Sequence, residues 1–138
     1  MRALLFHCKN YKTKVETLAN RPKDIEPEEV NEKEQSCEDC VVALITVEKG
    51  DNIKKCCKGI TEELTKMSQE VGHNNIVIVP FAHLSKKLAD TTKGLEALNC
   101  IEETMNNGHR VMRAHFGSHK ALLLDIYGHP GNARYREF

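Results

Sequence analysis

The chain has 138 residues, 40% hydrophobic and 29% charged, which is the composition of a soluble globular protein with room for one core. Its 20 basic and 20 acidic residues cancel, so an RNA partner would need a local basic face rather than an overall field. No apolar run is long enough to span a bilayer and no signal peptide is visible. We therefore expect a cytoplasmic protein with reduced cysteines, and no membrane partner.

Short apolar runs predict the strands of the first third of the chain. Arg2–Cys8 predicts an internal strand, and Cys40–Glu48 predicts a central one because it is β-branched and unbroken. Residues 9–39 between them are polar, and we interpret them as a loop or hairpin excursion. If the first strand runs parallel to its neighbours, His7 and Cys8 at its end would lie near His83.

A β-α-β unit is predicted over residues 41–81. Gly50 with Asp51 or Asn52 predicts the turn and N-cap of a helix, and Gly72 stands where a C-cap glycine belongs. The helix carries one apolar stripe at spacings of three and four residues: Ile53, Cys56, Cys57, Ile60, Leu64, Met67 and Val71. The strand Ile76–Phe81 follows, and we expect a right-handed connection.

The second half predicts one more helix and two more strands. The helix begins at Asp90–Thr92 and ends at Asn107-Gly108. Arg110–Phe116 and His119–Tyr127 predict an antiparallel hairpin because only Gly117-Ser118 separates them. Residues 132–138 predict a polar tail. The element order indicates an α/β fold in a single domain, 1–138, with one mixed sheet and helices packed on it.

Two segments of the sequence contain candidate functional residues. The buried run Ile76–Val79 ends at Pro80, so Phe81–Ser85 leaves the sheet at the carboxyl end of a strand, where ligands bind in open α/β sheets. His83 could touch a substrate there, or be a structural hydrogen-bonder. Lys120 is either an ordinary solvated lysine or a cation placed for a phosphate, a carbonyl oxygen or a developing oxyanion.

The cysteines carry a weaker signal. Cys37 and Cys40 form a C-x-x-C, which is one half of a zinc site, but Cys56 and Cys57 point in different directions from a helix and fit its buried stripe. For Cys56 and Cys57, core packing is favoured over a metal or redox role. The chain contains no G-x-G-x-x-G, P-loop, nucleophile elbow or H-E-x-x-H, and spacing assembles no catalytic triad. We expect no cofactor and no metal.

Three ordered segments resemble a known family: P-F-A-H-L-S at 80–85, F-G-x-x-K at 116–120 and G-H-P at 128–130. With R-x-L-L-x-H at 2–7 and V-E-K at 47–49, they are similar to the N-terminal editing domain of archaeal threonyl-tRNA synthetases over nearly the whole chain. The resemblance implies a fold related to D-aminoacyl-tRNA deacylases, usually homodimeric. It implies hydrolysis of L-serine wrongly attached to threonine tRNA, with the 2′-hydroxyl of the terminal adenosine assisting the water.

The resemblance also implies roles for residues of this chain. Lys120 would hold the reacting centre and its water, and His83 would contact the serine or the adenosine. The remaining substrate-binding positions would be Val47, Phe81, Ala82, Phe116, Gly117 and His119. Two positions depart from the family pattern. The family commonly has an aromatic residue where this chain has His119, and often an acidic residue where it has Ala133.

The partners implied are the 3′ end of tRNA(Thr) carrying serine and a synthetase catalytic body in cis or in trans, because the chain lacks the class II synthetase motifs. Two alternatives stay open. A D-aminoacyl-tRNA deacylase would share the fold, although its G-x-x-Q-F-T-L-type signature is missing. A non-catalytic module could use the same sheet to hold an amino acid or adenosine.

Overall fold

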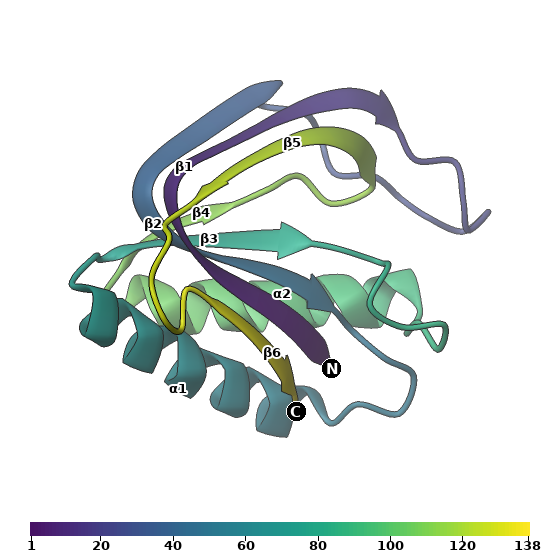
Figure 1. Cartoon of the computed structure of the whole chain (residues 1–138). Helices are drawn as coiled ribbons and strands as arrows, with labels where there is room; N and C mark the ends of the chain where they lie inside the picture. The colour runs from purple at the N-terminus through teal and green to yellow at the C-terminus, as the bar shows by residue number, and fades with distance from the viewer.

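The computed structural model describes all 138 residues. Six strands join in one mixed sheet and two helices pack on it (Figure 1), which confirms the predicted α/β class. In chain order the elements are β1 (Arg2–Leu18), β2 (Glu34–Thr46), α1 (Ile53–Val71), β3 (Asn75–Pro80), α2 (Thr91–Asn106), β4 (Arg110–Arg113), β5 (Ser118–Ile126) and β6 (Ala133–Glu137). Neither helix has the length and apolar character needed to cross a membrane.

The strand order is β4-β3-β2-β1-β5, and β6 pairs with the first residues of β1. Strands β2, β3 and β4 run parallel, whereas β1 is antiparallel to β2, β5 and β6. The two parallel crossovers pass through α1 and α2. The carboxyl ends of three adjacent strands therefore meet at one edge of the sheet.

Helix α1 follows the predicted pattern. Asn52 caps it by accepting a hydrogen bond from the backbone N–H of Lys55 at 3.1 Å, and Gly72 ends it in the left-handed conformation at φ 72°. Its predicted stripe faces the sheet, with Cys56 and Cys57 buried in the core. The core role expected for these two cysteines is confirmed. Asp90 caps α2 in the same way as Asn52 caps α1.

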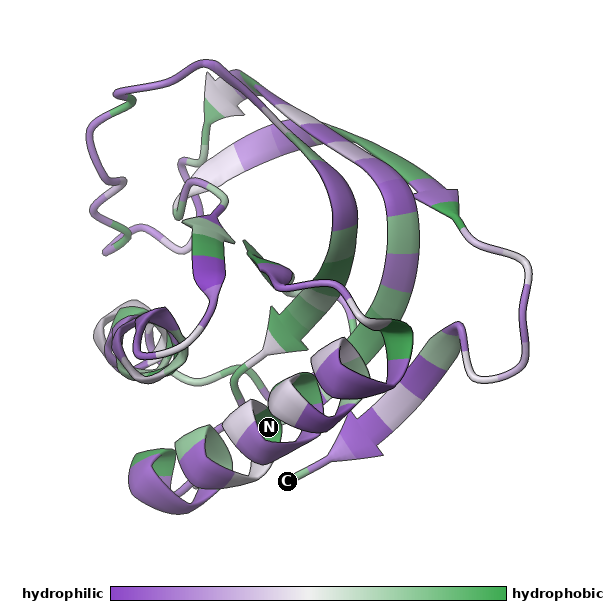
Figure 2. Cartoon of the chain, turned by 90° about the vertical axis from the view of Figure 1, so that its left-hand side faces the viewer, coloured by the Kyte–Doolittle hydropathy of each residue, from purple (hydrophilic) through white to green (hydrophobic).

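The 9–39 segment is a long hairpin. Strand β1 continues to Leu18, β2 begins at Glu34, and residues 19–33 connect them. The outer halves of β1 and β2, with β5, arch over β3, and hydrophilic and hydrophobic residues alternate along them (Figures 1 and 2). The sequence of this part is polar because one side of the arch faces water, while Tyr11, Thr13 and Val15 alternate inward and are buried.

Two buried clusters lie on opposite faces of the sheet. The larger packs β1, β2 and β3 against both helices. The smaller lies inside the arch and contains Cys8, Tyr11, Cys40, Val42, Leu44, Val77, Val79 and Ala114. Neighbouring residues of β2 and β3 alternate between the clusters, so both strands are buried on both faces.

The predicted hairpin between Arg110–Phe116 and His119–Tyr127 is wrong. Strand β4 pairs parallel with β3 at one end of the sheet, whereas β5 pairs antiparallel with β1 at the other. Gly117-Ser118 is a bend between these places rather than a hairpin turn. The crossover through α2 places β4 beside β3, on the side away from β2. The chain then crosses to the other end of the sheet, where β5 lies beside β1.

The predicted polar tail is also wrong, because Ala133–Glu137 forms β6 opposite Arg2–Phe6. Its polar sequence is explained by ion pairs to α1. Arg134 contacts Glu63 and Glu70, and Arg136 contacts Glu63 at 2.9 Å.

Candidate functional site

The carboxyl ends of β2, β3 and β4 bring most of the predicted site residues to one edge of the sheet. Val47 follows β2 and Phe81 follows β3, and the backbone N–H of Phe81 donates to the carbonyl of Ile45 at 2.9 Å. Ala114 follows β4, and its N–H donates to the carbonyl of Ile78 at 2.8 Å. Ligands bind at this edge of open α/β sheets.

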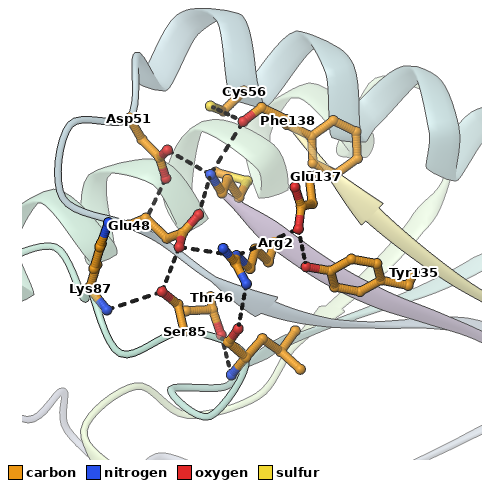
Figure 3. Close-up of polar contacts among 12 residues, drawn as sticks. Arg2, Thr46, Glu48, Asp51, Cys56, Ser85, Lys87, Tyr135, Glu137 and Phe138 are labelled. Carbon is orange, nitrogen blue, oxygen red and sulfur yellow. Dashed lines mark hydrogen bonds and ion pairs between the residues drawn. The ribbon is translucent and has the colours of Figure 1, made fainter.

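The turn after β3 is anchored by side chains that follow β2. The Thr46 hydroxyl donates to the carbonyl of Phe81 and accepts the backbone N–H of Leu84 at 3.3 Å. The Glu48 carboxylate accepts the Ser85 hydroxyl and pairs with Arg2 at 3.1 Å (Figure 3). The Ser85 hydroxyl, and after it the charge of Arg2, hold the pKa of Glu48 below its ordinary value.

The start of β1 completes this support. Arg2 donates to the carbonyl of Leu84 at 3.4 Å, and the amino nitrogen of Met1 lies 2.6 Å from Asp51. Asp51 in turn accepts the backbone N–H of Glu48 at 2.7 Å (Figure 3). Within the similar segments 2–7 and 47–49, Arg2 and Glu48 therefore fix the 80–85 turn, a role that sequence reasoning missed.

The anchored turn leaves Ala82 and His83 exposed. His83 makes an edge-on contact with Phe81, with ring centroids 5.1 Å apart. A depression of about 540 Å³ opens beside it, lined by Arg2, Ala82, His83, Leu84, Ser85 and Lys86. A second depression of about 560 Å³ lies across β1, β2 and β5 and contains none of the predicted site residues.

Lys120 is not an ordinary solvated lysine. It lies near the start of β5 opposite Val15, and its ammonium donates to the carbonyls of His115 and Ser118 at 2.8 and 3.0 Å and to the Ser118 hydroxyl at 3.3 Å. Burial lowers the pKa of Lys120, and the negative charge of Glu28 opposes that shift. All three acceptors of the ammonium belong to the 115–118 turn, so a substrate oxygen would have to replace one of these partners.

The same turn is clamped from the far side by the loop between β1 and β2. The Glu28 carboxylate accepts a two-pronged pair of hydrogen bonds from Arg113 at 2.6 and 2.9 Å, and a third from the backbone N–H of Phe116 at 2.9 Å. Arg113 also binds Glu102 at 2.6 Å. Burial alone would raise the pKa of Glu28, but the hydrogen bonds from Arg113 and Phe116 lower it overall.

Three further predicted residues belong to this region. Phe116 packs against the larger core cluster beside Gly94 of α2. Gly117 has φ 81°, and a Cβ there would lie 2.8 Å from the Cα of Pro27, so both the backbone and the space call for glycine. His119 is exposed on β5.

The predicted residues thus form two groups on neighbouring connections of the sheet. Val47, Phe81, Ala82 and His83 surround the turn after β3, and Phe116, Gly117 and Lys120 surround the turn after β4. No hydrogen bond joins His83 to Lys120, whose ammonium bonds to His115 and Ser118.

His7 does not approach His83. Because β1 is antiparallel to β2, His7 pairs with Val41 at the opposite end of the buried strands. Its ring lies between His129 and His73, with N···N distances of 2.7 and 2.9 Å. Burial and these two neighbours lower the pKa of His7. The condition under which His7 would lie near His83, a first strand parallel to its neighbours, is therefore not met.

All six cysteines are free thiols, and no cluster of three or more His, Cys, Asp or Glu side chains has the arrangement needed to hold a metal ion. The candidate site thus consists of backbone carbonyls, an ammonium, an imidazole and apolar walls. Such groups can orient an ester and a water molecule and can stabilise developing negative charge.

Comparison with known proteins matches the sequence of this chain to one family. The model of the archaea-specific editing domain of threonyl-tRNA synthetase matches residues 1–138. The chain is 35% identical over 133 residues to a threonine–tRNA ligase of Staphylothermus marinus and 36% identical over 135 residues to one of Thermococcus sibiricus. It is 32% identical over 130 residues to a threonine–tRNA ligase editing subunit of Saccharolobus solfataricus.

Each match covers 94% of this chain but only 21% of either ligase and 32% of the editing subunit, so the chain spans about a fifth to a third of these relatives. The family model spans the whole of the sheet and both helices described above. The chain therefore belongs to the archaea-specific editing domains of threonyl-tRNA synthetase, a family of aminoacyl-tRNA hydrolases.

Proposed function

We propose that the chain proofreads tRNA(Thr) by hydrolysing the ester of wrongly attached L-serine. Serine lacks only one methyl group of threonine, and selection by binding against a missing methyl is worth only about 1–3 kcal/mol. A synthesis site therefore needs a second, hydrolytic site that excludes threonine by crowding its methyl group. Family membership and the two-turn site at the sheet edge support this proposal.

The observation that carries the proposal is the fixed ammonium of Lys120. It is half-buried and held by three oxygen acceptors on a turn that is itself clamped, so it is a positive charge of defined position. Such a charge can orient a water molecule and stabilise the oxyanion of a tetrahedral intermediate. The 2′-hydroxyl of the terminal adenosine would assist the attacking water.

The other residues would bind the substrate. His83, exposed above the depression beside the 80–85 turn, would contact the serine or the adenosine. Val47, Phe81, Ala82, Phe116, Gly117 and His119 would shape the pocket. Ala133, where the family often has a carboxylate, lies in β6 opposite Phe6, and we assign no catalytic role to that position.

We further propose the partners. One relative is a threonine–tRNA ligase and another a threonine–tRNA ligase editing subunit, so a synthetase body would meet this domain in cis or in trans. A second copy of the chain would pair through β5, whose outer edge is unpaired and which exposes Leu122, Leu123 and Ile126. Cytoplasmic tRNA(Thr) would be the substrate.

The test is deacylation of Ser-tRNA(Thr), Thr-tRNA(Thr) and a D-aminoacyl-tRNA by the purified chain and its Lys120→Met variant. We expect loss of L-serine only, slowed in the variant by about 100-fold or more, the usual effect of removing one charge-stabilising donor. Lys12→Met, on the exposed side of β1, is the matched control and should hydrolyse at the normal rate.

Three outcomes contradict the proposal in different ways. A normal rate for Lys120→Met would remove Lys120 from the mechanism. Hydrolysis of D-aminoacyl esters alone would assign the chain to chirality checking. No hydrolysis by the unaltered chain would leave a module that only binds.

A further inference from the structure

The alternation of inward and outward side chains along the β1–β2 hairpin is interrupted at one position. Its register pairs Cys8 with Cys40 and Asn10 with Glu38 but leaves the position between them unpaired, and there Asp39 has φ 46°. Asp39 is the only non-glycine residue with positive φ. A left-handed residue inside a strand costs free energy and is a reason to look for a role nearby.

The consequence of this kink is that two thiols share one face. Residues three apart on a regular strand point to opposite sides of a sheet. Cys37 and Cys40 nevertheless both contact the cluster inside the arch, Cys40 fully buried and Cys37 partly so. The Cys40 thiol donates to the carbonyl of Cys37 at 3.7 Å, so the chain folds back on itself between the two cysteines.

We propose that Cys37 and Cys40 are a redox-active dithiol that closes to an intramolecular disulfide when the protein meets hydrogen peroxide. This site is separate from the two turns of the candidate editing site. It does not depend on the proposed deacylation, and nothing in the family assignment requires it.

The two sulfurs are suited to different steps. The nearby Cys40 thiol lowers the pKa of Cys37 to about 7, against the opposing effects of burial and of Asp39 and Glu38. The same pairing and burial raise the pKa of Cys40. Cys37, which is also the more exposed, is therefore the nucleophile, and Cys40 is the resolving thiol.

The reaction balances with peroxide as the oxidant. The Cys37 thiolate attacks one peroxide oxygen, the O–O bond breaks, and Cys37 becomes a sulfenic acid with release of hydroxide. The Cys40 sulfur then attacks the Cys37 sulfur, the S–O bond breaks, and a disulfide and a second hydroxide form. With the proton from Cys40 and one from solvent these become water, and an external dithiol reverses the oxidation.

A second pair of thiols provides an internal comparison. Cys57 of α1 and Cys100 of α2 also interact, but burial, and after it Cys100, raise the pKa of Cys57 to about 11. At neutral pH the lowered pKa of Cys37 and the raised pKa of Cys57 give Cys37 the larger thiolate fraction. The lower nucleophilicity of the more acidic thiolate cancels only part of this advantage, so Cys37 should react at least about 10-fold faster than Cys57.

The experiment uses the full chain at neutral pH. It is treated with a small excess of hydrogen peroxide, quenched with N-ethylmaleimide under denaturing conditions, and read by peptide mass spectrometry. We expect Cys37 and Cys40 to lose the label together, with the loss of two hydrogen atoms in mass, before Cys57 reacts. Dithiothreitol should restore both labels.

Two variants separate the steps. Cys37→Ser should leave Cys40 reduced at the same peroxide dose, and Cys40→Ser should leave Cys37 as a sulfenic acid that dimedone traps. Because Cys37 is only partly buried, its serine variant is expected to fold. The proposal is overturned if Cys37 reacts no faster than Cys57, or if Cys40 still oxidises in Cys37→Ser. It is also overturned if the two residues oxidise in different molecules of the unaltered protein.

Discussion

The clamp between Glu28 and Arg113 predicts a large energetic coupling between residues that are 85 positions apart. The Glu28 carboxylate receives three charge-assisted or backbone hydrogen bonds, and the two side chains are 27% and 15% exposed. A hydrogen bond to a charged group contributes about 1.5–3 kcal/mol when buried, and partial exposure reduces this. We expect a coupling of about 1–2 kcal/mol. A loss of that much unfolding free energy lowers the Tm of a protein of this size by about 3–8 °C.

The assay is a double-mutant cycle of Glu28→Gln and Arg113→Met, measured by urea unfolding. Urea is uncharged, and the ionic strength is kept low, so the ion pair is not screened. The exposed pair Lys58 and Glu62, 3.9 Å apart on α1, is the control and should couple by less than about 0.5 kcal/mol. A Glu28–Arg113 coupling no larger than that of the control would refute the reasoning.

The pH dependence of this clamp follows from the lowered pKa of Glu28. Its stabilisation is complete above the unfolded-state value of about 4.3 and is lost as the pH falls through the lower value of the folded state. The coupling should therefore be full at neutral pH and should shrink when the cycle is repeated in strong acid. An unchanged coupling in acid would mean that the contact is not ionic.

Two further predictions concern the same turn. Gly117→Ala should destabilise the fold by about 1–3 kcal/mol, because the new methyl group would meet Pro27 and the backbone has φ 81°, whereas Gly108→Ala, with open space around it, should change the free energy of unfolding little. If the Lys120 ammonium serves hydrolysis, the enzymatic rate, after subtraction of spontaneous hydrolysis, should fall as the pH rises through the lowered pKa of Lys120. Glu28→Gln should move that fall to lower pH, because the Glu28 charge raises this pKa.

Local patterns were enough to predict the elements whose stability is local. The stripe and caps of α1 were read correctly because a helix bonds to itself, and Asn52 and Gly72 act within four residues of their partners. The buried run of β3 was read correctly because a strand covered on both faces is apolar throughout. Its end at Pro80 also placed Phe81–Ser85 at a sheet edge suited to ligands.

Strand pairing was predicted less well, because a strand's hydrogen bonds are completed by residues that sequence spacing does not identify. Gly117-Ser118 has the composition of a tight turn, yet β4 and β5 take partners on different sides of the sheet. Residues 133–137 have no apolar run, and they form β6 because β1 offers a free edge and α1 offers carboxylates for Arg134 and Arg136.

The candidate site also has features that local sequence predicts and features that depend on long-range contacts. The amino-acid sequence by itself determined the family, the α/β class and the identity of Lys120 and His83 as candidates, since these rest on residue type and order. Only the tertiary structure showed that Lys120 is held by the 115–118 turn, that Glu28 clamps this turn and that Glu48 anchors the other. The Glu28 and Glu48 contacts join residues that are far apart in sequence, and the Lys120 contacts require the bend at 115–118 that Glu28 holds. These contacts therefore depend on how the whole backbone folds.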